Sequence, residues 1–600
     1  MTRTRTLRLV AIAAVPVVSI LLNGRSSDPL PRLFRRPVPR SARPLGTSGR
    51  VAPPDAPMGV DAELRQDPSP LARLTVPDGA AAVEQRSPGK EPAAKLVARF
   101  DGMGVGFQGP QGSATLRNPS DNSLAVGPDH IVQIVNSRMA IFTKQGKRFT
   151  ATGQALYGPV NTNHVFAGFG GRCEARNNGD AVVRYDQLAG RWLIVMPIFS
   201  RGPVRDDQPP VWQASPTARS SPAGVAGQPG AGARLVAPAP APAPPPPAAA
   251  GRGGALGEPA PQGPYSMCYA ISAGADPLGP YYRYEFLRPL FPDYPRPAIW
   301  GDGYYTPTST GDEVIQKHIC VADRARMLAG QPATEQCLVV NDVNFLNAAD
   351  IDGMAGPPKG APAIILAAGG TQLQKDFEDD GLYVWAMHVD WESPAKTTLT
   401  GPAKVAVAPY RYLCDGQLTS CVPQPGAARR LDAQGDKIMA RLVYRKIGNR
   451  ESVVAVHSVN TSAGGGGVRW YELRVEPDRR LSLYQQGTYA PDSLFRWLAS
   501  PAMDRHGNIG IGYSFGGGEH FAGQRFAARR AADPKGTLPL AEVTLVEGEA
   551  AQNALRWEDY TQTAMDPDDD CTIWYSGDYL KKDAANYSSA IGAFQLPGCK

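Results

Sequence analysis

Short runs of alternating apolar and polar residues, separated by turns, make up most of the chain after Leu96. In the clearest run, Ala-Met-Asp at 502–504 ends one segment, Arg-His-Gly-Asn forms a turn, and apolar residues alternate from Ile509 to Tyr513. Asp and Asn bond to turn backbone and Gly supplies a positive φ, so the turn has a physical cause. Alternation with a period of two on both sides predicts a β-hairpin.

The same order of residues returns closer to the C-terminus. Arg-Trp at 496–497 followed by Ala-Met-Asp at 502–504 matches Arg-Trp at 556–557 followed by Ala-Met-Asp at 564–566. Looser hairpins of the same kind are predicted at 123–136, 180–195, 294–305, 362–387 and 439–456. The repetition indicates that one structural unit is used several times.

Irregular all-β units at a spacing of roughly 40–60 residues are typical of a β-propeller, in which four-stranded sheets stand around a central channel. We therefore predict a β-propeller with seven blades, with six blades or a pair of β-sandwiches as alternatives. We expect Trp192, Trp300, Trp497 and Trp557 to occupy equivalent positions in their blades. Helical periodicity is nearly absent, and only 323–330 is predicted to form a short helix.

Three segments fall outside the hairpin pattern and define the domain organisation. Residues 1–24 combine basic residues with an apolar run shorter than the span of about 20 residues that a bilayer needs, which predicts a secretory signal peptide, with an uncleaved anchor as the alternative. Residues 25–95, rich in Pro and Arg, predict a disordered tether. The Pro/Ala-rich segment 201–263 predicts a disordered insertion between two strands of a propeller domain that spans 96–600.

The eight cysteines contain no C-x-x-C pair, which leaves zinc ribbons and thioredoxin-like chemistry without support. An even number of cysteines in an exported chain predicts disulfides. Spacing favours Cys414–Cys421, Cys320–Cys337 and Cys571–Cys599, leaving Cys173–Cys268 across the insertion. Spacing does not prove connectivity, because eight cysteines allow 105 pairings.

The net charge of +6 is concentrated at the N-terminus. Residues 1–50 hold ten arginines and one acid, Asp28, a balance of +9, so the other 550 residues sum to −3. Nucleic-acid binding requires a basic surface, and the predicted propeller domain has no excess of positive charge, so the sequence does not support nucleic-acid binding. We expect a secreted, extracytoplasmic monomer with no nucleic-acid partner and no membrane span beyond the N-terminal segment.

Four strings of the sequence are distinctive. They are Ala-Val-Gly-Pro-Asp-His at 125–130, Gly-Phe-Gly-Gly-Arg-Cys-Glu at 168–174, Tyr-Gln-Gln-Gly-Thr-Tyr-Ala-Pro-Asp at 484–492 and Arg-Trp-Glu-Asp-Tyr at 556–560. With them, most of 118–600 outside the insertion resembles a family of uncharacterised secreted bacterial proteins. The resemblance implies a propeller-like fold and export, and because the family has no assigned activity it supplies no catalytic residues. The chain departs from the family mainly by the insertion before Cys268 and by the N-terminal tether.

Two motif matches lack the structural context that their chemistry needs. Gly-Tyr-Ser-Phe-Gly at 512–516 matches the hydrolase nucleophile elbow around Ser514, but the glycine-rich segment after it cannot start the required helix. The run 104–109 matches a dinucleotide fingerprint, but we predict no strand before it, and Pro110 and Gly112 prevent a helix after it. The seven histidines are dispersed, so a zinc site would have to be assembled from distant residues.

Polar residues recur just before the strand predicted to be innermost in each blade, where a propeller places them on one face around its channel. They are Asp121, Asn122, Glu174, Asp180, Asp293, Tyr294, Asp436, Arg496, Glu558 and Asp559. Mixed carboxylates, Arg and Tyr are typical of a glycan-binding or glycoside-cleaving site, since paired carboxylates serve as general acid and nucleophile. The alternative is that these residues only satisfy strand ends and tryptophan N–H groups.

The candidate catalytic residues are Asp180, Asp293, Asp559, Glu174, Arg496 and Tyr560. A sialidase-like site would also need three arginines around a carboxylate, for which Arg296, Arg496 and Arg556 can be nominated by position alone. We carry two hypotheses. The first is a non-catalytic binding or scaffold propeller for glycan, peptide or cell-wall material. The second is a glycoside hydrolase or lyase that uses the carboxylates at the channel.

Four acids lie within five positions from Asp566 to Asp570. Carboxylates this close repel one another unless a cation or several N–H groups neutralise them, and oxygen ligands at this spacing suit Ca²⁺. Since alternate residues of an extended segment share a face, we predict a structural Ca²⁺ site at Asp566, Asp568 and Asp570 and no other cofactor. The alternative is a solvated turn whose acids cap backbone N–H groups.

Overall fold

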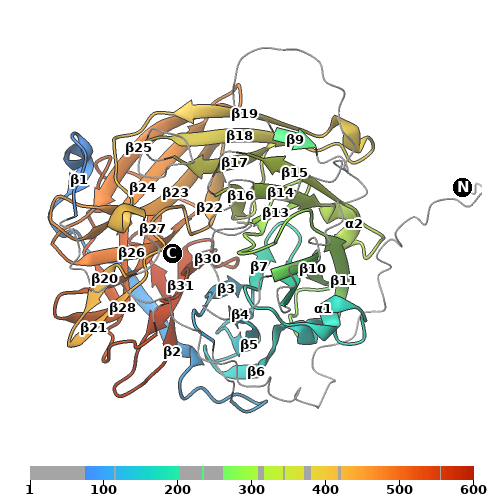
Figure 1. Cartoon of the computed structure of the whole chain (residues 1–600), viewed down its shortest axis with the longest axis horizontal. Coiled ribbons are helices and arrows are strands. Elements are labelled where there is room, and N and C mark those ends of the chain that lie inside the picture. The colour runs from blue at the N-terminus through green and yellow to red at the C-terminus, as the bar shows by residue number, and fades with distance from the viewer. Residues whose placement is uncertain are drawn as a thin grey trace, which may run out of the picture. The chain divides into compact units, whose positions relative to one another are not determined.

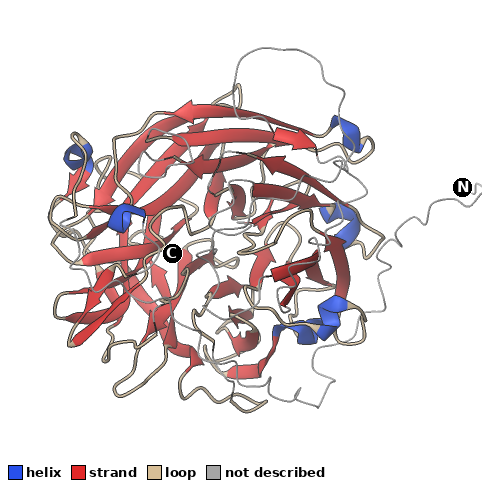
Figure 2. Ribbon diagram, viewed as in Figure 1, coloured by secondary structure: helices blue, strands red, loops and turns tan. Residues whose placement is uncertain are grey.

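Antiparallel β-sheet dominates the computed structural model of the chain (Figures 1 and 2). The structure describes residues 74–113, 117–201, 233–235, 261–308, 317–341, 343, 345–369, 380–416, 420–554 and 556–599. All of these residues belong to one compact unit.

The chain forms four-stranded sheets one after another, each an antiparallel meander. The first contains β3 (Ser123–Val126), β4 (His130–Val135), β5 (Arg138–Thr143) and β6 (Ala155–Asn161). The second contains β7 (Val182–Asp186), β8 (Arg191–Arg201), β10 (Pro261–Ser272) and β11 (Tyr281–Leu287). The third contains β12 (Ala298–Ile299), β13 (Tyr304–Thr308), β14 (Lys317–Ala322) and β15 (Glu335–Val340), with β9 (Ala233–Leu235) added at its edge.

The fourth and fifth sheets are joined by parallel pairing of their first strands, β16 and β22. The fourth contains β16 (Asn347–Asp352), β17 (Ala363–Ala368), β18 (Leu382–His388) and β19 (Thr398–Val405). The fifth contains β22 (Leu442–Ile447), β23 (Arg450–Asn460), β24 (Gly466–Val475) and β25 (Leu481–Tyr489). The sixth contains β26 (Phe495–Met503), β27 (Ile509–Gly517), β28 (His520–Arg529) and β29 (Val543–Val546).

The seventh sheet closes the fold by combining both ends of the described chain. It contains β30 (Gln562–Met565), β31 (Thr572–Tyr579), β32 (Ser588–Gln595) and, paired antiparallel with β32, β2 (Lys95–Gly104). First strands of neighbouring sheets contact each other, and β30 of the seventh sheet contacts β3 of the first. The seven-bladed β-propeller is therefore confirmed, and two separate sandwiches are excluded.

The hairpin that opened the sequence pattern has the predicted turn. One carboxylate oxygen of Asp504 accepts hydrogen bonds from the backbone N–H of His506 (2.8 Å) and Asn508 (2.9 Å), and Gly507 has a φ of 84°. The strands on either side are buried on both faces rather than one. The cause is that each blade lies between two neighbours, so both faces of its inner strands are covered.

The helices are few and short among the described residues. The predicted one is α2 (Arg324–Leu328), where the Asp323 side chain accepts a hydrogen bond from the Arg326 N–H. The other helices and the small ribbon are α1 (Arg172–Ala175), η2 (Ala80–Val83), η3 (Thr162–Phe166), η4 (Pro394–Lys396), η5 (Leu413–Gly416), β20 (Val422–Gln424) and β21 (Ala427–Leu431). No helix in the described part of the chain is long and apolar enough to cross a membrane.

Three sequence-based boundaries need correction. Residues 74–95, assigned to the tether, belong to the fold: β1 (Glu84–Gln85) pairs parallel with β25, and Ala94 is buried. Within the predicted insertion 201–263, β9 pairs with β15 and β10 begins at Pro261. A strand, β2, does precede the 104–109 match. β1 and β9 have two and three residues, too few for an alternating pattern, which is why the sequence did not reveal them, whereas the ten residues of β2 do alternate. Residues 1–73, and the rest of the insertion, lie outside the described residues.

The four tryptophans are all fully buried but do not occupy equivalent positions. Trp192 lies in the second strand of its blade and Trp300 follows a first strand, whereas Trp497 lies in a first strand and Trp557 precedes one. The expectation of equivalence was wrong, because the blades share sheet pairing rather than a common packing residue.

All four disulfides form as the spacing favoured. Their Cα–Cα distances are 5.9 Å for Cys173–Cys268, 4.1 Å for Cys320–Cys337, 5.8 Å for Cys414–Cys421 and 5.5 Å for Cys571–Cys599. The Cys173–Cys268 bridge links α1 to β10, across the insertion. Four disulfides are typical of a chain that folds in an oxidising compartment.

Candidate functional site

The middle of the channel is filled by charged side chains from the first strands. Arg441 pairs with Asp350 (2.8 Å) and Asp352 (2.7 Å), and Asp350 also lies 3.3 Å from Arg184. Arg184 in turn donates to the Gln562 side chain at 2.8 Å. A cavity of about 30 Å³ remains beside these groups, enough for one or two water molecules. The middle of the channel therefore has room for water but not for a larger ligand.

We call the end at which the chain enters each first strand the channel mouth. Here, side chains from the approaches to the seventh, first, second and third blades converge. The channel-mouth cluster consists of Asp121, Asp180, Tyr294, Arg296, Asp559 and Tyr560. Of the candidate catalytic residues, the structure thus brings together Asp180, Asp559 and Tyr560.

The backbone of the cluster is held in the left-handed region at four positions. φ is 47° at Asp121, 49° at Asp180, 42° at Tyr294 and 70° at Asp559. Asp tolerates this conformation because its side chain bonds locally, but for Tyr it is uncommon. Such positions cost on the order of 1–3 kcal/mol each and persist where the surrounding fold enforces them, often at binding or catalytic sites.

Asp121 and Asp180 form a carboxyl pair. Asp121 is 1 % exposed, and its burial, followed by the charges of Asp180 and Asp559 and a hydrogen bond shared with Asp180, raises its pKa well above the usual range. Asn136 donates to the other Asp121 oxygen, and the backbone N–H of Asp121 donates to the Glu558 carbonyl at 2.8 Å. Burial and the neighbouring acids therefore favour the protonated form of the Asp121 carboxyl.

Two tyrosines stand beside this pair. The rings of Tyr294 and Tyr560 lie 4.5 Å apart between centroids, and the Tyr294 hydroxyl donates to the Met439 carbonyl. Tyr560 is 5 % exposed, yet its hydroxyl has no hydrogen-bond partner among the described residues. Burial, reinforced by the charges of Asp121 and Asp180, raises the Tyr560 pKa well above its usual value, so the phenol stays protonated. It can donate to a ligand.

The arginines do not form the triad that a sialidase-like site would need. Arg556 pairs with Asp432 (2.7 Å) and with Asp559, so its charge is already neutralised at the mouth. Burial raises the pKa of Asp432 to about 7 in spite of Arg556. Only Arg296 of the three nominated arginines faces the cluster without a carboxylate partner among the described residues.

The remaining candidates lie in other surroundings. The Glu174 carboxylate accepts the N–H groups of Gly168 (2.8 Å) and Gly170 (2.5 Å), which shapes the loop before α1. Arg496 is fully buried against Asp492 (2.8 Å) and Glu542 (2.9 Å). The structure does not bring these two into the channel-mouth cluster.

Asp293 lies beside the cluster, because its charge acts on Arg296. Asp436 pairs with Lys437 at 2.6 Å.

Asn122 and Glu558 point away from the mouth into a buried polar network. Glu558 accepts from Ser514, from the Gln524 side chain (2.7 Å) and from the Asp578 N–H, and Asn122 donates to the Asp578 carboxylate at 2.6 Å. No Lys or Arg in the described part of the chain forms an ion pair with either acid, and burial raises the pKa of Asp578 to about 7. The network joins blades six, seven and one beneath the mouth.

Ser514, the residue of the rejected nucleophile elbow, belongs to this network. It lies within β27, is fully buried and accepts a hydrogen bond from the Trp557 indole N–H at 2.9 Å. It therefore has a structural partner and no exposed hydroxyl.

The acidic turn at the opposite end of the channel is neutralised by basic side chains. The Lys144 ammonium pairs with Asp566 (2.6 Å) and Asp568 (2.9 Å). Asp570 makes a bidentate pair with Arg445. Asp569 caps the N–H groups of Cys571 and Thr572, each at 2.9 Å. Of the three predicted Ca²⁺ ligands, two thus form ion pairs with Lys144 and the third with Arg445. Ca²⁺ binding stays a prediction.

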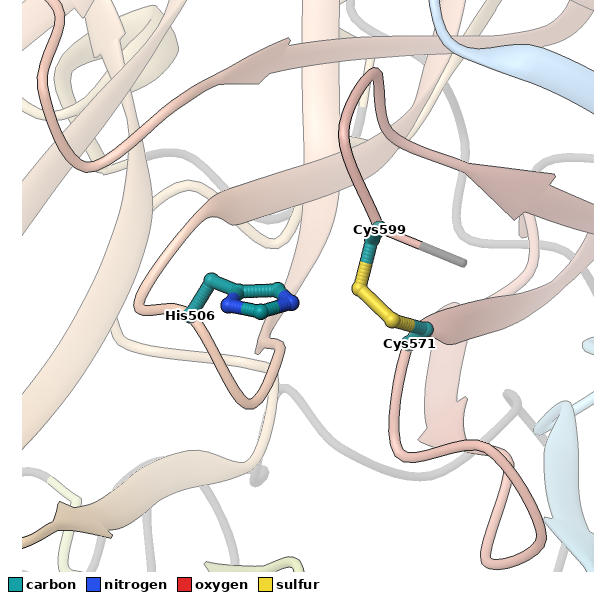
Figure 3. Close-up of side chains that lie close together, drawn as sticks. All are labelled: His506, Cys571 and Cys599. Carbon is teal, nitrogen blue, oxygen red and sulfur yellow. A yellow bond between two sulfur atoms is a disulfide. The ribbon is translucent and has the colours of Figure 1, made fainter.

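Two groups of metal-type side chains elsewhere are accounted for by disulfides. Figure 3 shows His506, in the turn between β26 and β27, facing the Cys571–Cys599 bridge. Glu335 lies near the Cys320–Cys337 bridge in the same way. Oxidised cysteines have no thiolate to offer a metal, so the sulfur atoms of these groups are not ligands.

Sequence reasoning missed several residues that complete the site. Asp432, Lys437 and Phe345 lie in loops ahead of β22 and β16, and Lys317 begins β14. Asp180 and Asp559 were found by examining the residues before each first strand. The same rule, applied further ahead of β22, would have found Asp432, and it would have found Phe345 if β16 had been predicted. No sequence signal marked Lys317.

Comparison with known proteins gives no assignment. No family model and no curated protein matches the chain. Among solved structures, a protein of unknown function from Dyadobacter fermentans is 9 % identical, with coverage of 84 % of this chain and 100 % of that chain and a TM-score of 0.33. The NanB sialidase of Streptococcus pneumoniae is 8 % identical over 70 % of this chain and 67 % of its own, with a TM-score of 0.34. An intramolecular trans-sialidase from Ruminococcus gnavus is 8 % identical over 67 % and 90 %, with a TM-score of 0.30. Likenesses this low carry no argument about function, and the fold rests on the pairing of the sheets.

Proposed function

We propose that this chain is an extracytoplasmic binding propeller that holds a glycan at its channel mouth. The supporting observation is the convergence of strained, buried polar residues from four blades, with a polar atom left for a ligand. The buried Tyr560 hydroxyl has no hydrogen-bond partner among the described residues. Buried polar groups are almost always paired, so an unpaired hydroxyl beside a mouth suits a ligand rich in hydroxyl groups.

The spacing of the carboxyls favours binding over hydrolysis. Glycosidases place their two carboxyl groups at least about 5 Å apart, whereas Asp121 and Asp180 are in hydrogen-bond contact. A sugar hydroxyl can donate to a carboxyl oxygen of Asp180 while Tyr560 donates to a ring or hydroxyl oxygen.

The test is a binding screen of the purified protein against glycan arrays, cell-wall polymers and peptides. Asp180→Asn and Tyr560→Phe are expected to weaken glycan binding at least tenfold, since each removes a charge or a donor from the site. Asp478→Asn, on an exposed turn of the fifth blade, serves as the matched control and should bind like the wild type. Absence of binding across all glycans, or binding that ignores Asp180 and Tyr560, contradicts the proposal.

The second candidate is a glycoside hydrolase or lyase, favoured by the raised pKa of the buried Asp121 carboxyl beside Asp180. A carboxyl that stays protonated at neutral pH is suited to general acid catalysis. Turnover of a glycan found in the screen would be abolished in Asp180→Asn and in Asp559→Asn. Full activity of both variants would exclude this version of the mechanism.

A further inference from the structure

Arg296 carries a buried charge that forms no ion pair with the described residues, although the charge of nearby Asp293 acts on it. It is 6 % exposed, and its guanidinium lies 4.5 Å from the Tyr294 ring centroid and 4.7 Å from that of Phe345. Two of its nitrogens donate to one acceptor, the Leu346 carbonyl, at 3.1 and 2.7 Å. The third, Nη1, has no partner, and no carboxylate of the described residues lies within ion-pair distance.

Several other buried arginines in the described part of the chain have more partners. Arg288 and Arg441 pair with carboxylates at 2.8 Å. Arg469 and Arg529 form no ion pair with a described carboxylate, but each donates to three different acceptors. Burying a charge without an ion pair is unfavourable, so a ligand anion beside Arg296 would be stabilising.

Two further cations gather around the same aromatic ring. The ammonium of Lys437 lies 4.4 Å from the Phe345 ring centroid, and that of Lys317 lies 5.7 Å from it. The charge of Lys437 also acts on Asp559 of the channel-mouth cluster. Three positive groups thus lie around the Phe345 ring, of which Lys437 is paired with Asp436.

The mouth meets solvent next to these groups. The side chains of Arg556 and Asp559 are 33 % and 19 % exposed, whereas Arg296, Lys317 and Lys437 are buried.

We propose that the ligand of the channel mouth is an acidic glycan, whose carboxylate or sulfate group pairs with Arg296 between Tyr294 and Phe345. This inference rests on the proposed glycan-binding function and names its ligand class. The hydroxyl groups of the same sugar bond to Asp180 and Tyr560, so Arg296 and these two residues recognise two parts of one ligand.

The experiment compares three oligosaccharides of equal length by calorimetry: one made of glucose, one containing glucuronic acid and one carrying sulfate esters. At least one acidic oligosaccharide should bind ten times more tightly than the neutral one, and Arg296→Met should remove this advantage, since loss of one member of a buried charge pair weakens binding strongly. Arg505→Met, at the opposite end of the channel, is the control and should retain the advantage.

The outcomes separate this inference from the proposed function. If neutral and acidic oligosaccharides bind equally well and Asp180→Asn abolishes both, the proposed glycan site stands and the proposal of an acidic ligand is wrong. If Arg296→Met fails to fold, Lys437→Met and competition by inorganic sulfate on the wild type provide the same readout. Acidic binding that neither variant nor sulfate weakens also overturns it.

Discussion

Asp578 is a buried carboxyl without a cation among the described residues, and it makes the stability of the propeller depend on pH. Burial raises its pKa from 3.8 to about 7. An acid with a raised pKa in the folded state keeps its proton more readily when folded than when unfolded. Its contribution to stability is therefore fully present below pH 3.8 and is lost as the pH rises towards 7.

The magnitude follows from the shift of about three units, each worth 1.36 kcal/mol, which gives a total loss of about 4 kcal/mol. Between pH 5 and pH 8 the loss is about 3 kcal/mol. Asp578→Asn keeps the shape and the hydrogen bond from Asn122, and it removes the ionisation. Relative to wild type, this variant should gain about 3 kcal/mol in free energy of unfolding between pH 5 and pH 8.

The assay is thermal unfolding followed by circular dichroism at several pH values. Unfolding entropy of about 2 cal/mol/K per residue gives roughly 1 kcal/mol/K for a domain of roughly 500 residues. The difference in Tm between Asp578→Asn and wild type should thus change by about 3 °C. Asp478→Asn, which alters an exposed carboxylate ionised throughout this range, should run parallel to wild type. If Asp578→Asn also runs parallel, the reasoning about the buried acid is wrong.

Three other outcomes are expected. Lys144→Met removes the ion pair of the buried Asp566 and should lower the free energy of unfolding by about 3 kcal/mol. Millimolar Ca²⁺ should raise the Tm of this variant more than that of wild type. Melting curves that overlay with Ca²⁺ and with chelator in both proteins would show that the acidic turn holds no cation. Replacing Cys173 and Cys268 together by Ala opens a loop of 95 residues, so in the chain-entropy model it should cost about 4–5 kcal/mol in denaturant unfolding, about twice the cost of opening the Cys414–Cys421 loop; equal costs would contradict that account. A chain that begins at residue 75 should unfold cooperatively on heating, like the full chain. A chain that begins at residue 105 lacks β2, which leaves the seventh blade with three strands, and should lose the cooperative transition. A cooperative transition in the shorter chain would show that the ring does not need this strand.

Local patterns predicted the blades because each hairpin is a local structure. Alternation, Asx turns and glycines are all visible within about fifteen residues. Short spacing between cysteines favoured three of the disulfides, and Cys173–Cys268 was the pair left over. The approach to each first strand also brought Asp180 and Asp559 to one place, since the propeller repeats that geometry.

The partners of charged side chains could not be predicted in the same way. Lys144 and Asp566 are separated by 422 positions and meet only because the seventh blade stands next to the first. Arg496 lies near the start of a first strand, as a residue of the channel mouth would. Its guanidinium nevertheless pairs with Asp492 and Glu542 and does not join the channel-mouth cluster. Ion pairs depend on which blades become neighbours and on side-chain direction, neither of which has a local sequence signal.

The pairing of β2 with β32 sets an order of assembly. It joins Lys95 to Gln595, and until both have left the ribosome the ring stays open, whatever has formed between them. Contacts between such distant positions form late, because the entropy of closing the loop must be met first. During that interval β2 and the exposed flank of the first blade can accept strands from other chains. Pairing of β2 with β32 covers these edges, so completion of the last blade also ends the period in which the chain can associate through them.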